Sequence, residues 1–326
     1  FLITASAACV ASVLPFGSLQ ATEGTFPPVR WRGSALGAQG LIELHQSDPR
    51  EAHFILEKCQ REIDRLVDLF SLSRPHSALS RLNESGILES PDIQFLELLS
   101  LAQAFSEQTD GIFDITVQPL WKFYADYFAV RDNKNKQPSD ADVRQVLKNI
   151  GYKKLHLSAN RVEFERPGMA ITLNGIAQGY ITECVKELLQ SAGYTNVLLS
   201  LGEVATIGPK AGGVPWKVEL EPGDTKSSKQ QRVISLDNQA VATSGAYGSP
   251  FGDQPHANHL LNPKSGRWAT LRGSISVVSS KATIADMYST ALTLLDISGR
   301  KRLLASSRNI NAVYYSDPSE GESWFA

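Results

Sequence analysis

The chain has 326 residues, of which 42% are hydrophobic and 20% are charged, and its formal net charge is −2. This is the composition of an ordinary globular protein, and the length allows one large or two moderate domains. Because the net charge is close to zero and no dense run of Lys and Arg with interleaved aromatic residues occurs, the sequence argues against a nucleic-acid-binding protein.

Residues 1–21 are mostly apolar, rich in Ala and Val, and end in small residues, which is typical of a secretory signal peptide. The run has neither an initiator Met nor a basic first region, so we interpret it as a signal peptide truncated at its start. It is too short, and too interrupted by Pro15, to be a convincing membrane span. Residues 22–30 are interpreted as a linker. Membrane association is expected only if Cys9, in a sequence that resembles a degraded lipoprotein signal, carries a lipid.

After the linker, the sequence predicts a strand over 31–44 with a glycine-rich middle. A strong amphipathic helix follows over 51–69, and its apolar face is expected to contain Phe54, Ile55, Cys59, Ile63, Leu66, Val67 and Phe70. Beyond a loop and a short turn at 77–83, the apolar spacing predicts helices over 91–109, 120–128 and 140–150 and a hairpin over 152–164.

The stretch from Met169 to Gly193 organises the middle of the chain. It reads as a short buried strand over 170–173, a turn made permissive by Gly175 and Gly179, and a helix, with another strand at 196–201. Such a turn allows close approach of a ligand, and the free N–H groups at the start of the helix favour an anion. The alternative interpretation is an ordinary packed βαβ turn, and spacing alone does not decide between them.

Strands and helices also mix in the last third of the chain. The pattern predicts strands over 216–220, 258–266, 274–280 and 310–315, two more within 233–243, and helices over 283–295 and 299–305. Because the elements do not alternate strictly, we expect an α+β fold rather than a doubly wound sheet. Cys59 and Cys184 both fall on predicted helices, and they are expected to be buried free thiols because their spacing does not call for a disulfide.

One helical motif carries oxygen ligands at a useful spacing. Asp286, Ser289 and Thr290 lie at i, i+3 and i+4, so their oxygens face one side of a helix. A carboxylate with hydroxyls and carbonyls is a hard, all-oxygen set that suits Mg²⁺ and leaves room for phosphate oxygens. The structural alternative is that Asp286 stabilises the helix dipole while the hydroxyls bond back to the helix backbone.

Two further motifs could carry chemistry. His259 precedes an apolar pair and could act in general acid–base catalysis, although such a histidine is often structural and His256 is a competitor. Phe113 and Asp114 follow the turn at Gly111 and could bind a planar ring and its polar edge. Their structural alternative is a helix N-cap at Asp114 with Phe113 in the core.

These motifs occur together in an order that resembles the ApbE family of flavin transferases, also called FAD:protein FMN transferases. The resemblance covers about residues 31 to 315. Its most specific parts are Ser77-Ala-Leu-Ser-Arg-Leu-Asn83, Gly111-Ile-Phe-Asp-Ile-Thr-Val-Gln-Pro-Leu120, Leu173-Asn-Gly-Ile-Ala-Gln-Gly-Tyr180, His259-Leu-Leu-Asn-Pro-Lys-Ser-Gly266 and Ala285-Asp-Met-Tyr-Ser-Thr-Ala291.

The resemblance implies a two-lobed domain over 31–326 with a flavin-binding cleft, in a protein of the bacterial periplasm. It implies Mg²⁺-dependent attack of a Ser or Thr hydroxyl of an acceptor flavoprotein on FAD, so that FMN joins the acceptor and AMP leaves. The acceptor would be a redox subunit or a small FMN-binding domain. By match, the resemblance implies three groups of residues: His259 as the catalytic residue; Gly175, Asp286, Ser289 and Thr290 at the metal; and Ile112, Phe113, Asp114, Thr172, Gln178 and Leu260 around FAD.

The chain also departs from the family pattern. Ser73 stands where an aromatic residue that stacks on flavin is common, Thr172 where an acid is frequent, Gln178 where an acid or Lys is frequent, Asn262 where the motif has Asp, and Gly202-Glu203 where it has Gly-Gly-Asp. The expected ion ligands and His259 are retained, so we expect an active enzyme. Two alternatives are a metal-dependent FAD pyrophosphatase, which would give FMN and AMP, and a non-enzymatic exported FAD-binding protein.

Overall fold

The computed structural model describes residues 27–45, 48–130, 136–220, 232–246, 251, 257–317 and 321–325. The predicted signal peptide, most of the predicted linker and His256 lie outside the described residues, so these interpretations stay predictions. The linker ends earlier than expected, because Val29 and Arg30 already belong to the first strand. None of the described helices is both long enough and apolar enough to cross a membrane.

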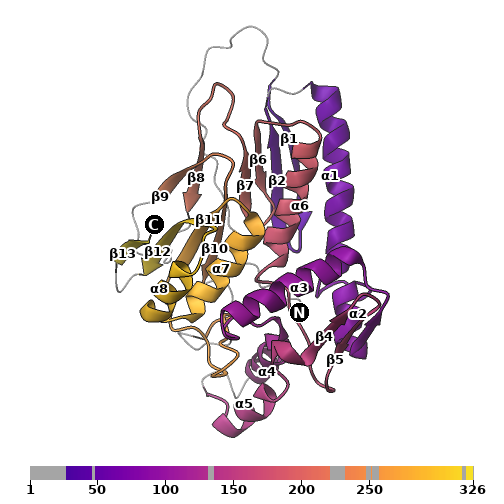
Figure 1. The fold of residues 1–326 in the computed structure, drawn as a ribbon, viewed down its shortest axis with the longest axis vertical. Coiled ribbons are helices and arrows are strands. Elements are labelled where there is room, and N and C mark those ends of the chain that lie inside the picture. The colour runs from indigo at the N-terminus through magenta and orange to yellow at the C-terminus, as the bar shows by residue number, and fades with distance from the viewer. Residues whose placement is uncertain are drawn as a thin grey trace.

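A large antiparallel sheet forms the centre of the molecule (Figure 1). Its eight strands are ordered β1-β2-β6-β7-β10-β11-β12-β13, and every neighbouring pair is antiparallel. Their bounds are β1 Val29–Ala35, β2 Ala38–Leu44, β6 Val197–Ser200, β7 Val204–Ile207, β10 Ala240–Gly245, β11 Ser274–Ser279, β12 Ile310–Asp317 and β13 Gly321–Phe325. An antiparallel sheet with helices at its face is the predicted α+β class.

The single strand expected over 31–44 is in fact a hairpin of β1 and β2. The chain reverses at Leu36 and Gly37, whose φ angles of 47° and 89° are those of a tight two-residue turn. Trp31 covers the glycines of both strands, since a Cβ added at Gly33 or Gly40 would lie within 2.8 Å of its ring. The glycines therefore leave room for the ring of Trp31, and they do not mark the middle of a single strand.

Helices pack side by side on the sheet (Figure 1). They are α1 Pro49–Phe70, α6 Ala177–Ser191, α7 Ala282–Leu294 and α8 Ile297–Ala305, close to the predicted ranges. The predicted face of α1 is buried, with the exception of Phe54, which is 58% exposed. Cys59 is a buried free thiol as predicted, whereas Cys184 on α6 is free but only half-buried.

The strand predicted over 170–173 does not form. These residues pair with no strand: the Thr172 N–H donates to the carbonyl of Ile115 at 2.8 Å, and the side chain of Asn83 bonds both backbone groups of Ile171. The Asn83 amide donates to the carbonyl of Ile171 at 2.8 Å, and its oxygen accepts from the Ile171 N–H at 2.7 Å. The expected turn at 77–83 is part of a helix, α2 Ala78–Ser85, in which Ser77 is the N-cap. The strand prediction over 170–173 failed because an apolar pattern shows that a segment is buried but not which group its backbone bonds to.

The remaining elements cover the other side and one end of the sheet. The hairpin of β8 Trp216–Leu220 and β9 Arg232–Leu236 forms a second core with Leu198, Val204, Val241 and Val278. A small sheet contains β3 Ile87–Glu89, β5 Arg161–Phe164 and β4 Leu155–Ser158, preceded by a short helix η3 at Tyr152–Lys154. The predicted helices appear as α3 Ile93–Gln108, α4 Gln118–Ala129, with η1 Ile115–Val117 before it, and α5 Asp140–Leu147.

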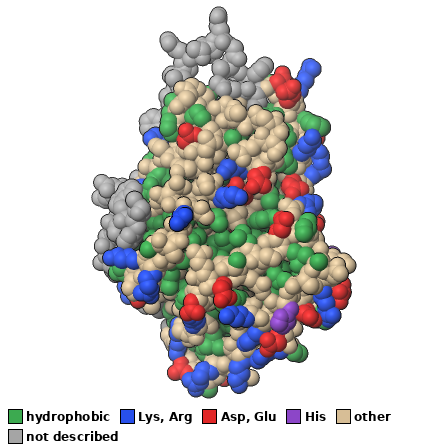
Figure 2. All heavy atoms as spheres, viewed as in Figure 1, with side chains coloured by type: hydrophobic (Ala, Val, Ile, Leu, Met, Phe, Trp, Pro, Cys, Tyr) green, Lys and Arg blue, Asp and Glu red, His purple; other side chains and the backbone are tan. Residues whose placement is uncertain are grey.

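The described surface carries charges of both signs. On the face shown in Figure 2, Lys and Arg side chains are interspersed with Asp and Glu. This distribution gives that face no continuous basic stripe of the kind that follows a nucleic-acid backbone.

Candidate functional site

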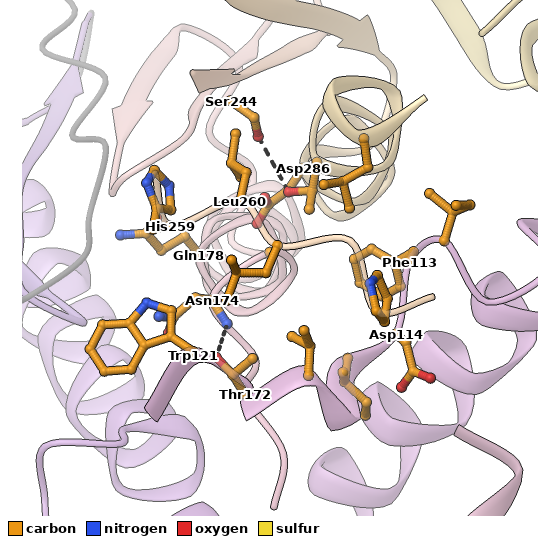
Figure 3. Close-up of a pocket in the computed structure, with 18 of the residues that line it drawn as sticks. Phe113, Asp114, Trp121, Thr172, Asn174, Gln178, Ser244, His259, Leu260 and Asp286 are labelled. Carbon is orange, nitrogen blue, oxygen red and sulfur yellow. Dashed lines mark hydrogen bonds between the residues drawn. The ribbon is translucent and has the colours of Figure 1, made fainter. Parts of the chain in front are cut away.

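A cavity lies where the central stretch, α7 and the end of β10 meet the segment before α4 and the loop after residue 257 (Figure 3). Its walls contain Ile112, Phe113, Asp114, Ile115, Val117, Trp121, Thr172, Asn174, Gly175, Gln178, Glu203, Thr243, Ser244, His259, Leu260, Leu261, Pro263, Asp286, Thr290 and Leu294. Six separate segments of the chain thus contribute to one site, and most residues predicted for FAD, metal and catalysis lie in it.

Unpaired polar atoms are concentrated around this cavity. Among the described residues, four buried side-chain polar atoms have no hydrogen-bond partner, and three of them belong to Trp121, Glu203 and His259, which line it. A buried polar group without a partner is unfavourable by about 1–3 kcal/mol. Such groups are therefore expected where a ligand supplies the missing partner.

Asp286 is held at the contact between α6 and α7. Its carboxylate accepts a hydrogen bond from the backbone N–H of Gly179 at 2.9 Å. A Cβ at Gly179 would lie 2.6 Å from the carbonyl oxygen of Ala282 and 2.7 Å from the Cβ of Asp286, so only glycine permits this approach. Burial raises the pKa of Asp286 well above its usual range. The site therefore favours a cation or a proton at this carboxylate.

A second acidic residue, Glu203, enters the cavity from the turn between β6 and β7. It is 4% exposed, and its Oε2 has no partner. Burial, and then the charge of Asp286, raise the pKa of Glu203 well above its ordinary value. The sequence singled out Leu201-Gly202-Glu203 as part of the motif order and as a departure from Gly-Gly-Asp, but it did not assign Glu203 to the site, because the approach of the β6–β7 turn to the cavity exists only in the fold.

The hydroxyl groups of the predicted metal motif divide into two roles. Thr290 lines the cavity and lies against Gly175, where an added Cβ would be 2.9 Å from the Thr290 Oγ1. Ser289 is fully buried and absent from the cavity lining; its hydroxyl donates to the Asp286 carbonyl at 2.9 Å and pairs with Ser244 at 2.7 Å. Ser289 thus makes the back-bond of the structural alternative, and Ser244, which was not among the predicted metal ligands, presents a hydroxyl to the cavity in its place.

This donor set fits a hard divalent cation. The described residues contain no cluster of three or more His, Cys, Asp or Glu side chains that could hold a metal ion by themselves. The cavity instead offers carboxylates, the Thr290 and Ser244 hydroxyls and the backbone of Gly175, and it contains no Lys or Arg among its described lining. Oxygen ligands with space for ligand oxygens are what Mg²⁺ prefers.

His259 lies on another wall of the cavity, on the same side as Trp121 (Figure 3). It sits in a loop rather than in the predicted strand, since the structure has here only isolated bridges, one of which joins Leu261 to Trp268. The loop is shaped by Asn258, whose side chain accepts from the N–H of Leu260 at 3.1 Å and donates to the carbonyl of Ala269 at 3.0 Å. Burial lowers the pKa of His259 to about 4, so its imidazole is neutral at pH 7.

The six residues expected around FAD all line the cavity: Ile112, Phe113, Asp114, Thr172, Gln178 and Leu260. Asp114 is nevertheless occupied by the fold, because it caps η1 through the N–H and hydroxyl of Thr116 at 2.8 and 2.6 Å and accepts from the Tyr152 N–H at 2.9 Å. Its carboxylate points away from Asp286 and His259 (Figure 3). The N-cap interpretation of Asp114 is thus correct, and Phe113 is both in the core and at the cavity wall.

Sequence reasoning did not identify Trp121 as part of this site. Its indole Nε1 is buried without a partner, and its ring lies edge-on to Phe251 with centroids 5.8 Å apart. By contrast Ser73, where an aromatic wall was expected, is absent from the lining and bonds Ser71. The apolar pattern of α4 could have placed Trp121 on a helix, but not at a cavity.

Comparison with known proteins identifies the family of the chain. The sequence matches the ApbE family over residues 36–314. It is 29% identical over 245 residues to the FAD:protein FMN transferase of Vibrio cholerae, covering 72% of this chain and 73% of that protein. It is 24% identical over 312 residues to the protein of the same name from Escherichia coli K12, covering 93% of this chain and 84% of that protein. Since the match spans most of its length, the chain belongs to the ApbE family.

Solved structures have the same fold. The structure of the flavin transferase ApbE from Vibrio cholerae aligns with a TM-score of 0.77 at 23% identity, covering 92% of this chain and 97% of that chain. The ApbE protein from Thermotoga maritima also aligns with a TM-score of 0.77, at 26% identity, covering 91% and 96%. The predicted α+β, ApbE-like fold is therefore confirmed.

Proposed function

We propose that this protein transfers FMN from FAD to a Ser or Thr hydroxyl of an acceptor flavoprotein, with Mg²⁺ bound, and releases AMP. The relatives named FAD:protein FMN transferase support the transfer of FMN from FAD. The observation that carries the proposal is the cavity itself, in which His259, Asp286 and Thr290 share one space with all the residues expected around FAD.

The bonds that change are defined by this reaction. The acceptor oxygen forms a bond to the phosphorus of the FMN half of FAD, and the bond from that phosphorus to the oxygen of AMP breaks. We propose that His259 takes the proton of the acceptor hydroxyl, since its imidazole is neutral at pH 7. The negative charge of a bound diphosphate nearby would raise its basicity during the reaction.

Charge balance supports the proposal that a cation takes part. The described lining of the cavity has carboxylates but no Lys or Arg, so an FAD diphosphate would meet only like charges there. We propose that Asp286, Thr290 and the backbone of Gly175 hold Mg²⁺. When bound, Mg²⁺ would neutralise the diphosphate and orient it for in-line attack.

The apolar part of the cavity suits the rings of FAD. Phe113, Ile112 and Leu260 provide planar and aliphatic surface, and Gln178 and Thr172 provide polar contacts beside them. Ligand sites commonly combine apolar walls with a few such polar groups.

We also propose that the protein is exported to the bacterial periplasm, on the basis of the composition of residues 1–21. Immunoblots of periplasmic and cytoplasmic fractions should then show a shortened form of the protein in the periplasm.

The test compares the variants Asp286→Ala and His259→Ala with the wild type on an acceptor domain. FAD, Mg²⁺ and the acceptor are incubated with each protein, and flavin fluorescence of the acceptor band is read in a denaturing gel. We expect a fluorescent band with the wild type and a strong loss with both variants. Full labelling by both variants would overturn the assignment of the site, and FAD that stays intact in every reaction would favour a non-enzymatic FAD-binding protein.

A further inference from the structure

We propose that Glu203 supplies a second carboxylate to the cation site, in addition to Asp286, which makes it a positioning residue for the transfer reaction. This inference rests on the proposed function, because it assumes that the cavity takes a divalent cation. It assigns a role to a residue that the metal motif on α7 does not contain.

The turn that carries Glu203 is built to aim its side chain inward. The Leu201 N–H donates to the Glu203 carbonyl at 3.0 Å, and Gly202 between them has a φ of 108°, which glycine tolerates best. A Cβ at Gly202 would lie 2.7 Å from the side chain of Gln178 at the cavity wall. The turn is therefore fixed from both sides, and its next side chain enters the cavity.

The two oxygens of Glu203 have different surroundings. The backbone N–H of Thr243 donates to the carboxylate, which anchors one side, while Oε2 has no partner although the residue is 96% buried. A buried carboxylate oxygen is normally paired, so this one is expected to meet a group that arrives with the ligand.

A bound cation accounts for the unpaired Oε2 of Glu203 better than a hydrogen-bond donor on the ligand does. Glu203 and Asp286 both line a cavity whose described lining has no basic side chain, and the charge of Asp286 adds to burial in raising the pKa of Glu203. FAD would add a diphosphate to the same space. A positive ion between them offsets the repulsion among all three groups, and hard oxygen donors select Mg²⁺ or a close analogue.

The experiment measures metal binding without FAD. Mn²⁺ is used as an electron-spin probe for Mg²⁺, and its free concentration is followed during titration of the wild type, Glu203→Gln, Glu203→Asp and Asp286→Asn. The control is Glu84→Gln, which makes the same change at an exposed position on α2. Thermal unfolding of each metal-free protein establishes that it is folded.

We expect Glu203→Gln to bind Mn²⁺ about tenfold to a hundredfold more weakly than wild type, Glu203→Asp to recover part of the loss, and the control to bind normally. Wild-type affinity in Glu203→Gln, with binding lost in Asp286→Asn, would overturn this inference and leave the Mg²⁺ site standing. Absence of Mn²⁺ binding by the wild type would overturn the inference together with the metal part of the proposed function.

Discussion

The carboxylate of Asp286 on α7 accepts a hydrogen bond from the backbone N–H of Gly179, 107 residues earlier on α6. This contact joins two motifs that the sequence presents separately. It requires the two helices to approach so closely that the carbonyl of Ala282 would touch any Cβ at position 179. A backbone donor thus fixes the carboxylate before any ligand binds, which is the preorganisation that a catalytic site needs.

Replacement of Gly179 by Ala should therefore damage both stability and activity. The added methyl would lie 2.6 Å from the Ala282 oxygen, and backbone cannot move aside as a flexible side chain can. We expect a loss of about 1–3 kcal/mol in the free energy of unfolding, measured by urea denaturation. In Gly193→Ala the added Cβ meets no atom within 4 Å but the φ of 85° strains Ala, so this comparison variant should lose some stability and keep its transfer activity. A Gly179→Ala variant as stable as wild type would contradict the close approach of α6 and α7.

Asp286→Asn should separate stability from function. The amide oxygen can still accept from Gly179, and the change removes a buried carboxylate whose pKa burial raises. We expect the metal-free variant to be at least as stable as the metal-free wild type, with transfer reduced about a hundredfold or more. Thermal unfolding and the rate of acceptor labelling measure the two effects. A variant that unfolds more easily yet still transfers FMN normally would assign Asp286 a structural role only.

The pH dependence of stability should show the burial of His259. Its pKa is about 4 in the folded protein, below the ordinary value of 6.5, so between these values the unfolded chain binds more protons. The contribution of His259 to the free energy of unfolding is therefore complete above pH 6.5 and is lost as the pH falls toward 4. We therefore expect the free energy of unfolding to drop less between pH 7 and pH 5 in His259→Gln than in the wild type, as measured in urea. If the variant loses as much free energy of unfolding as the wild type between pH 7 and pH 5, or more, the imidazole of His259 is exposed to water rather than buried.

Asn83→Ala should loosen the wall that carries Thr172. Two backbone groups of Ile171 would lose the hydrogen bonds of 2.7 and 2.8 Å that replace a strand partner. We expect a loss of about 1–3 kcal/mol in the free energy of unfolding. Asn83→Asp keeps the acceptor but not the donor, so its stability should lie between the wild type and the Ala variant. If the Ala variant unfolds at the wild-type urea concentration, the extended segment is held by other contacts.

Local sequence patterns correctly predicted the helices whose formation depends mainly on their own residues. The helix α1 repeats apolar residues with the period of a helix and begins at Asp48, whose side chain accepts from Arg50 N–H at 2.8 Å. The helix α7 carries Asp286 and Thr290 one turn apart, and they do share the cavity. Motif order then indicated the ApbE family, which the family match over residues 36–314 confirms.

Features that depend on distant partners were not predictable in this way. The segment 170–173 is buried like a strand, but its partner is the side chain of Asn83. Ser289 and Ser244 are 45 residues apart, and which hydroxyl faces the cavity depends on how α7 meets β10. Glu203 likewise becomes part of the site only because the β6–β7 turn ends beside α7. The spacing of residues along the chain predicts which side chains share a face of one helix or strand, but it does not predict which elements contact one another.

The most direct test of the central claim is the stoichiometry of one reaction. Purified protein, FAD and Mg²⁺ are incubated with and without an acceptor domain, and AMP and flavin-labelled acceptor are quantified together by chromatography and mass spectrometry. We predict that AMP appears only when acceptor is present and in equal amount to labelled acceptor. AMP formed at the same rate without acceptor, with no labelled protein, would contradict transfer and identify the reaction as hydrolysis of FAD.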